Sequence, residues 1–166
     1  MIGKIVKGLV YLVVVVVLLI GGVFVAARFH DGPLGPIPGG PLMAGELVSQ
    51  PPADWTAVAA APEIELQLAY QNTSRTTWIF PLDGVAYVPA SLERPPGKKW
   101  HRAADENGEA FLRIDGKRYA VTLKRVQDEA EIAKLKEAIV KKYPMAAGMG
   151  SGGVWFFKVE PRPAVG

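Results

Sequence analysis

Cysteine is absent from the 166-residue chain, so disulfides, thiol nucleophiles and cysteine-based metal sites are excluded. Histidine is nearly absent, with only His30 and His101, and the HExxH pattern of zinc peptidases does not occur. The GxSxG pattern of serine hydrolases is missing, as is the Lys-Ser/Thr pair that completes a P-loop. The common motifs of hydrolases and nucleotide-binding proteins are therefore not present.

An excess of positive charge is also missing. The chain has 19 Lys and Arg against 16 Asp and Glu, and two of these cations, Lys4 and Lys7, precede a long apolar run. The rest of the chain is nearly neutral. A nucleic-acid-binding domain concentrates far more positive charge on one face, so nucleic acid is not an expected partner.

The apolar run is the clearest positive feature. Residues 8–27 are all uncharged. As a helix they would span about 30 Å, the thickness of the hydrocarbon core of a bilayer. Residues 1–30 are therefore predicted to be a single-pass anchor in the cell membrane. Lys4 and Lys7 place the amino terminus in the cytoplasm by the positive-inside rule, and the domain in the periplasm or another extracytoplasmic space.

A cleaved signal peptide is the alternative for this region. Val25, Ala26 and Ala27 resemble the small-residue site at which such peptides are cut. The apolar core of a signal peptide usually has about 7–15 residues, and the run here is longer, which favours an anchor that is retained.

Residues 31–62 are a Gly/Pro-rich segment. Its glycine and proline content excludes a helix or a central strand over most of its length. Leu34, Ile37 and Leu42 make it too apolar for a solvated linker, so we expect it to pack against the domain. Asp54 is expected to cap a short helix over residues 55–61. Residues 63–166 then form one domain.

Alternating apolar residues and tight turns predict strands in this domain. Asp83-Gly84 and Asp115-Gly116 are expected to be two-residue hairpin turns, because Asp and Gly tolerate the positive φ that a type I′ turn needs. A turn is expected at residues 71–74. The predicted strands are residues 63–70, 76–82, 85–89, 110–114, 117–126 and 154–159. Such hairpins indicate an antiparallel sheet, and its closure into a small barrel removes the exposed edges.

One amphipathic helix is predicted over residues 128–143. Asp128 and Glu131 resemble a capping box at its start. The buried stripe at helical spacing consists of Ile132, Leu135, Ile139 and Tyr143. The predicted fold class is therefore mainly β (α+β), with a single N-terminal transmembrane helix followed by an antiparallel split β-barrel and one amphipathic helix.

Two stretches offer groups that bind anions. Arg75, Thr76 and Thr77 supply a guanidinium and hydroxyls at a predicted turn of residues 74–78, a combination able to hold a phosphate. A predicted basic loop follows at residues 98–102, and Trp78 and Trp100 add aromatic surfaces. The alternatives remain open: a surface ion pair for Arg75, a solvated loop for the lysines, and core packing for both tryptophans.

The order of these patterns resembles that of a known superfamily. Residues 63–159 contain IELQLAY, SRTTWIFPLDGVAYV, a K-K-W loop, FLRIDGKRY, a helix ending in KKYP, and WFFKVEP. This series resembles the flavin- and deazaflavin-binding split-barrel superfamily, which includes pyridoxamine-phosphate-oxidase-like proteins and deazaflavin-dependent nitroreductases and quinone reductases. The resemblance implies FMN or a deazaflavin as cofactor. The expected cofactor contacts are Arg75, Thr76, Thr77, Trp78, Lys99 and Trp100, and no catalytic side chain is assigned.

Two functions follow as hypotheses. The first is a membrane-anchored flavin- or deazaflavin-dependent oxidoreductase that acts on a quinone or a nitro-type acceptor. The alternative is a non-catalytic split-barrel binding module tethered outside the cytoplasm, and the predicted topology favours it because free flavins are mostly cytoplasmic. Members of the superfamily often form homodimers. The aromatic residues Trp155, Phe156 and Phe157 are a candidate surface for such pairing.

Overall fold

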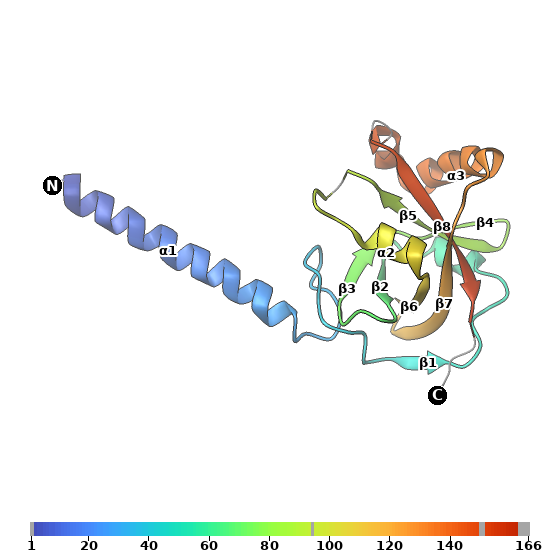
Figure 1. Cartoon of the computed structure of the whole chain (residues 1–166), viewed down its shortest axis with the longest axis horizontal. Coiled ribbons are helices and arrows are strands. Elements are labelled where there is room, and N and C mark those ends of the chain that lie inside the picture. The colour runs from blue at the N-terminus through green and yellow to red at the C-terminus, as the bar shows by residue number, and fades with distance from the viewer. Residues whose placement is uncertain (1, 94, 150–151, 163–166) are drawn as a thin grey trace.

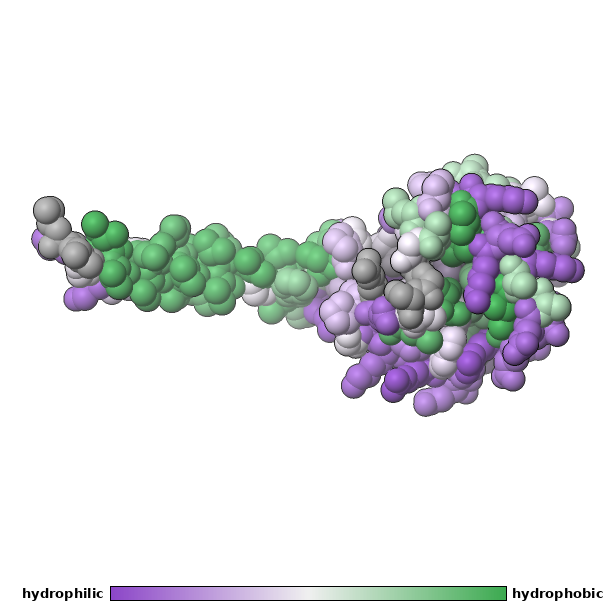
Figure 2. Space-filling view, turned by 90° about the horizontal axis from the view of Figure 1, so that it is seen from above, coloured by the Kyte–Doolittle hydropathy of each residue, from purple (hydrophilic) through white to green (hydrophobic). Residues whose placement is uncertain are grey.

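A computed structural model describes residues 2–93, 95–149 and 152–162. Helix α1 (Ile2–Ala27) projects away from the rest of the molecule (Figure 1) and is long and apolar enough to cross a membrane. Its large side chains from Ile5 to Val25 are exposed, and Figure 2 shows them as a continuous apolar surface along the helix. No other part of the described chain covers this surface, as expected for a segment that faces lipid.

Eight strands form one sheet. They are β1 (Glu46–Val48), β2 (Ile64–Leu68), β3 (Ser74–Thr77), β4 (Phe80–Leu82), β5 (Val85–Ser91), β6 (Glu109–Ile114), β7 (Lys117–Arg125) and β8 (Val154–Pro161). Seven of them pair antiparallel in the order β3-β2-β6-β7-β8-β5-β4, while β1 pairs parallel with β7.

The connection between β3 and β4 explains why the sheet curls. These strands lie at the two ends of the pairing order, yet only Trp78 and Ile79 separate them in the chain. Three peptide units reach at most about 11 Å, so the two edges must approach each other. The result is a barrel whose edge strands are joined by the chain and not by pairing. This agrees with the predicted split β-barrel.

Both Asp-Gly turns are confirmed. Asp83 has a φ of 52° and Gly84 of 78°, while Asp115 has a φ of 49° and Gly116 of 75°. These are the positive values that a type I′ turn requires at both central positions. The turns fix the register of β4 with β5 and of β6 with β7.

Helix α3 (Glu129–Lys142) packs on the outside of the sheet, and two 3₁₀ turns lie before β2 and after α3. The helix is capped by Asp128, whose side chain accepts a hydrogen bond of 2.7 Å from the Glu131 N–H, as predicted. A 3₁₀ turn, η1 (Thr56–Ala59), replaces the short helix expected over residues 55–61, and Asp54 accepts from the Thr56 N–H at 2.7 Å. A second 3₁₀ turn, η2 (Pro144–Met149), follows α3.

Two apolar clusters fill the domain. The interior of the barrel contains Leu66, Leu112, Val121 and Phe157, and the space between α3 and the outside of the sheet contains Phe80, Leu135 and Phe156. Neighbouring residues of β8 point into different clusters because side chains alternate along a strand. Phe156 and Phe157 are therefore buried within the chain and do not form a free surface for pairing. A homodimer stays a prediction.

Four local predictions were wrong. The single strand expected over residues 76–82 is divided between β3 and β4, and residues 74–77 form an edge strand where a phosphate-binding turn was predicted. The basic loop predicted at residues 98–102 becomes helix α2 (Trp100–Glu106) from Trp100 onward. The strand predicted over residues 63–70 ends at Leu68, and Tyr70 lies exposed in the turn after it. For the strands, pairing with distant segments overrides the local pattern.

The Gly/Pro-rich segment is bound to the barrel through Arg113. Its guanidinium pairs with Glu65 on β2 and, at 2.7 Å, with Asp31 of the segment. Asp31 also accepts from the Met43 N–H at 2.6 Å. Burial raises the pKa of Asp31, but this hydrogen bond and those from Arg113 and Ala44 outweigh it and lower the pKa below its ordinary value. The expected packing of the segment is confirmed.

Replacing Arg113 with Met should release this segment. The side chain is only 12% exposed, and its loss leaves two carboxylates without their partner. We expect a loss of about 3 kcal/mol in the free energy of unfolding, together with faster proteolysis within residues 31–45. Lys124→Met is the control, because the exposed pair of Lys124 with Glu160 contributes little. Equal losses in the two variants would contradict this role for Arg113.

Candidate functional site

A groove of about 770 Å³ lies beside edge strand β3. Its other walls come from the Gly/Pro-rich segment and from the loop before α2. All six cofactor contacts predicted from the sequence line it, although they come from two separate stretches of the chain. The lining residues are Arg28, Gly35, Pro36, Pro38, Glu63, Thr73, Arg75, Thr76, Thr77, Trp78, Pro95, Pro96, Gly97, Lys98, Lys99 and Trp100. Their roles as cofactor contacts stay predictions.

Arg75 is the central cation of the groove. Strand β3 holds it half-buried, with its guanidinium carbon 5.6 Å from the centre of the Trp100 ring. Nη2 donates to Gln71 Oε1 at 3.3 Å, whereas Nε is buried and has no hydrogen-bond partner. Burial lowers the pKa of Arg75 to about 10, so the group is still charged at neutral pH. One donor of this cation thus lacks an acceptor.

Lys98 brings a second cation to the same ring. Its Nζ lies 5.8 Å from the centre of the Trp100 ring. Burial, followed by repulsion from Arg75, lowers the pKa of Lys98 to about 8. Neither cation forms an ion pair with a carboxylate of the described residues, and Glu63 is the one acidic residue in the lining. Partly buried charges without partners are costly, so the groove is suited to an anion.

The two tryptophans have different positions. Trp100 is only 5% exposed and packs 5.7 Å from Phe157 within the barrel cluster, so it supports the two cations and offers no open face to a ligand. Trp78 is half-buried. Its ring stacks on Tyr143 at 4.5 Å with an interplanar angle of 8°. Of the two predicted aromatic surfaces, Trp78 is therefore the accessible one.

The remaining predicted contacts differ in what they can donate. Thr76 Oγ1 already donates to the Gly35 carbonyl at 2.7 Å, and a hydroxyl has a single proton, so Thr76 can only accept from a ligand. Thr77 lies in the lining half-buried, and Lys99 is exposed at the rim. His101 is buried on α2 with its ring edge against Trp155 at 5.1 Å, outside the lining.

Sequence reasoning missed several residues of this site. Lys98 was recognised only as nearby charge, and Arg28 and the prolines of the Gly/Pro-rich segment were not assigned to the site. The one signal in the sequence was the apolar content of that segment. It indicated that the segment packs against the domain but not which part of the domain it covers. Which wall a long segment covers depends on contacts such as the one between Asp31 and Arg113, 82 residues apart.

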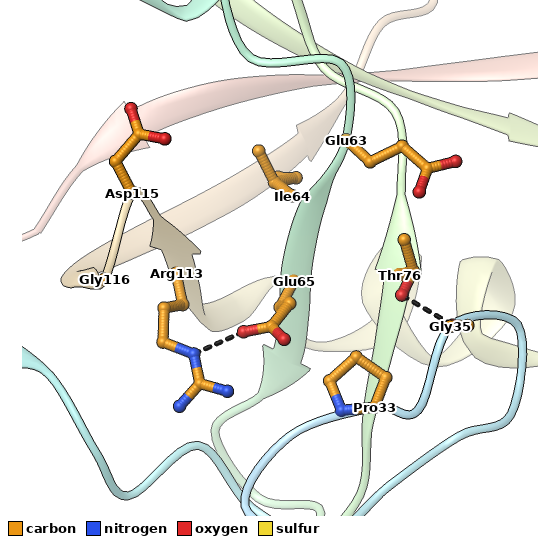
Figure 3. A pocket seen from close by; sticks show the side chains of 9 residues that line it. All are labelled: Pro33, Gly35, Glu63, Ile64, Glu65, Thr76, Arg113, Asp115 and Gly116. Atoms are coloured by element: carbon orange, nitrogen blue, oxygen red, sulfur yellow. Dashed lines mark hydrogen bonds and ion pairs between the residues drawn. The ribbon is translucent and has the colours of Figure 1, made fainter.

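A second hollow of about 370 Å³ lies on the other side of the Gly35 loop. Figure 3 shows Arg113 turned toward Glu65 there, with Thr76 bonded to Gly35. Its cation is already paired with carboxylates, so it offers nothing to an anion. The described residues contain no group of His, Cys, Asp and Glu suited to a metal ion. The groove beside β3 is therefore the candidate ligand site.

No protein-family model and no curated protein matches the chain. Similar solved structures include a protein of Jannaschia sp. CCS1 assigned as general stress protein 26, with 15% identity, a TM-score of 0.49, and coverage of 66% of this chain and 71% of that one. An FAD and heme binding protein from Mycobacterium smegmatis has 10% identity, a TM-score of 0.46 and coverage of 69% of both chains. An FAD-binding protein from Mesorhizobium loti has 16% identity, a TM-score of 0.42, and coverage of 64% and 86%. Neither a family nor a function follows from likenesses with TM-scores under 0.5.

Proposed function

We propose that the groove binds the phosphate and ring system of FMN or a deazaflavin, and that the protein is a membrane-anchored oxidoreductase acting on a quinone or a nitro-type acceptor. The observation that carries this proposal is the pair of cations at the Trp100 ring, Arg75 and Lys98, neither of which has an ion pair among the described residues.

The residues of the groove fit such a ligand. The buried Nε of Arg75 is a donor without an acceptor, and a phosphate oxygen would supply one. Trp78 and the prolines of the two walls offer apolar surface to a ring. A volume of about 770 Å³ lies in the usual range for small-molecule sites.

When bound, the cofactor supplies the redox chemistry. The chain supplies position and charge. Arg75 and Lys98 neutralise the phosphate, and Glu63 at the wall disfavours a second anionic group nearby. Helix α1 keeps the groove at a membrane, where a lipid-soluble quinone is available.

A non-catalytic binding module is the second candidate. Lys4 and Lys7 before α1 favour a domain outside the cytoplasm, where free flavins are scarce. A reporter fused to the carboxyl terminus distinguishes the two sides of the membrane. A cytoplasmic domain supports the oxidoreductase, and an exported one supports the binding module.

Direct titration tests the cofactor. The full chain in lipid nanodiscs is titrated with FMN and with the deazaflavin mononucleotide, and binding is followed by absorbance and flavin fluorescence. We expect micromolar binding of at least one of them. A protein that binds neither would contradict the proposed oxidoreductase and leave the binding module.

The pH dependence of this affinity should report Lys98. Below its pKa of about 8 the ammonium is charged and attracts the phosphate, and above it the attraction is lost. A charge-assisted hydrogen bond contributes about 1.5 kcal/mol, and most but not all of the Lys98 charge is lost between pH 7 and 9, so affinity should fall about fivefold over this range. Lys98→Gln should bind weakly at every pH in this range. An unchanged slope in Lys98→Gln would show that another group titrates.

A further inference from the structure

The segment that follows the membrane-spanning helix forms one wall of the groove. Its lining residues are Arg28, Gly35, Pro36 and Pro38. Arg28 comes directly after the last residue of α1, so the groove begins at the point where the chain leaves the bilayer. The ligand site and the membrane surface are therefore adjacent in this molecule.

The junction between α1 and the barrel is tightly packed. The Gly40 N–H donates to the carbonyls of Ala27 at 3.1 Å and His30 at 3.0 Å, which folds the segment back on the end of the helix. Added Cβ atoms would lie 1.7 Å from the Gly32 oxygen at Gly39 and 2.6 Å from the His30 oxygen at Gly40. Backbones this close leave little freedom, so the groove keeps a defined position relative to α1.

Apolar side chains are exposed at this junction. Phe29 is 87% exposed and Leu34 is 37% exposed. Leu34 begins a tight turn closed by two hydrogen bonds with Ile37, of 3.0 and 3.1 Å. In Figure 1 this turn and the loop between β5 and α2 both lie on the side of the barrel nearest α1. The described part of that loop next to α2, residues 95–99, includes the exposed Pro95 and Pro96.

The charges at the same place are mostly positive. Arg28 and Lys99 are exposed there, and neither has an ion pair among the described residues. Lys98, in the loop before α2, is half-buried and lines the groove. The opposing carboxylates include Glu63 in the groove wall and the exposed Glu93 of the loop between β5 and α2. Asp31 is also nearby but is already paired with Arg113. Apolar tips flanked by cations are suited to the headgroup layer of an anionic bilayer.

We propose that residues 28–37 and 95–99 form a membrane-docking surface that rests on anionic phospholipid headgroups and holds the mouth of the groove at the lipid surface. An amphipathic ligand dissolved in the bilayer then reaches Arg75 without crossing bulk water. The docking does not depend on which cofactor or ligand the groove binds.

The absence of cysteine makes a direct test simple, because one introduced cysteine is the only thiol in the full chain. Leu34→Cys and Pro96→Cys place an environment-sensitive fluorophore on the two loops. Glu129→Cys is the control, since it is exposed at the start of α3, on the far side of the barrel from α1 (Figure 1). Each labelled protein is placed in phosphatidylcholine vesicles with and without phosphatidylglycerol.

Quenching then distinguishes lipid from water. In the anionic vesicles, nitroxide lipids should quench the labels at positions 34 and 96, and aqueous iodide should quench the label at position 129. Lys99→Gln should lower the docking equilibrium about fivefold, since one cation near an anionic surface contributes about 1 kcal/mol. The proposal is overturned by iodide quenching that is equal at all three positions, or by docking that is the same without phosphatidylglycerol. Labels protected from both quenchers would also overturn it, because a second copy of the chain would then cover the loops.

Discussion

Replacing Arg75 with Met should weaken binding of the groove ligand and at the same time stabilise the protein. Arg75 is half-buried, has no ion pair among the described residues, and has a buried Nε without a hydrogen-bond partner. Its charge-assisted bonds to a phosphate should contribute about 2 kcal/mol, so the affinity should fall roughly thirtyfold. Methionine fills a similar volume beside Trp100 without the cost of burying charge. The free energy of unfolding should therefore rise by about 1 kcal/mol.

This opposite change in affinity and stability separates two roles for Arg75. If Arg75 only supported the fold, through its contacts with Gln71 and Trp100, its replacement would lower the free energy of unfolding and leave the ligand affinity unchanged. Arg102→Met is the matched control, because Arg102 is an exposed arginine on α2 outside the lining. Titration of FMN and denaturant unfolding of both variants give the two quantities. Normal affinity in Arg75→Met would remove this residue from the ligand site.

Replacing Lys142 with Met should cause a large loss of stability. Its Nζ donates to three backbone carbonyls, those of Val58, Ala61 and Ile79, each at 2.7 Å. One ammonium thereby joins the end of α3 to η1 and to the link between β3 and β4. Methionine keeps the length of the side chain but removes all three bonds. The Val58 carbonyl still accepts from the Ala61 N–H at 3.2 Å, and the Ile79 carbonyl from the Tyr143 hydroxyl at 2.8 Å. We expect the free energy of unfolding to fall by about 3 kcal/mol, because three hydrogen bonds from a charged donor are lost at once.

The adjacent lysine provides the control. Lys141 is exposed, and Lys141→Met should change the stability by no more than about 0.5 kcal/mol. A second measurement follows from the position of Ile79, which directly follows Trp78 of the groove. Without Lys142 the Ile79 carbonyl is held, among the described residues, only by the Tyr143 hydroxyl, at 2.8 Å. Trp78 should then shift on Tyr143, so ligand affinity should fall in Lys142→Met under conditions where the variant is folded. Equal unfolding curves for the two lysine variants would contradict this description.

Features that depend on neighbouring residues were predictable from the sequence. The span of α1, the Asp-Gly turns, the Asp128 cap and the alternation of Phe156 and Phe157 each follow from a local chemical preference. Backbone conformation, capping and periodicity are decided within a few residues, so a single sequence contains them. The candidate contacts of the groove also came from two local patterns, and the structure brings both patterns to one site.

The sequence alone determined the long apolar helix at the amino terminus, the β-rich class of the domain and the cationic and aromatic residues available for a ligand. The tertiary structure decided which of these residues are paired, buried or open. It divided the strand at Trp78 and Ile79, buried Trp100 under two cations, and turned Lys142 inward onto three carbonyls. It also placed Arg28 in the groove wall. Burial and charge pairing depend on contacts between distant segments that form only when the sheet closes. No pattern of neighbouring residues specifies those contacts.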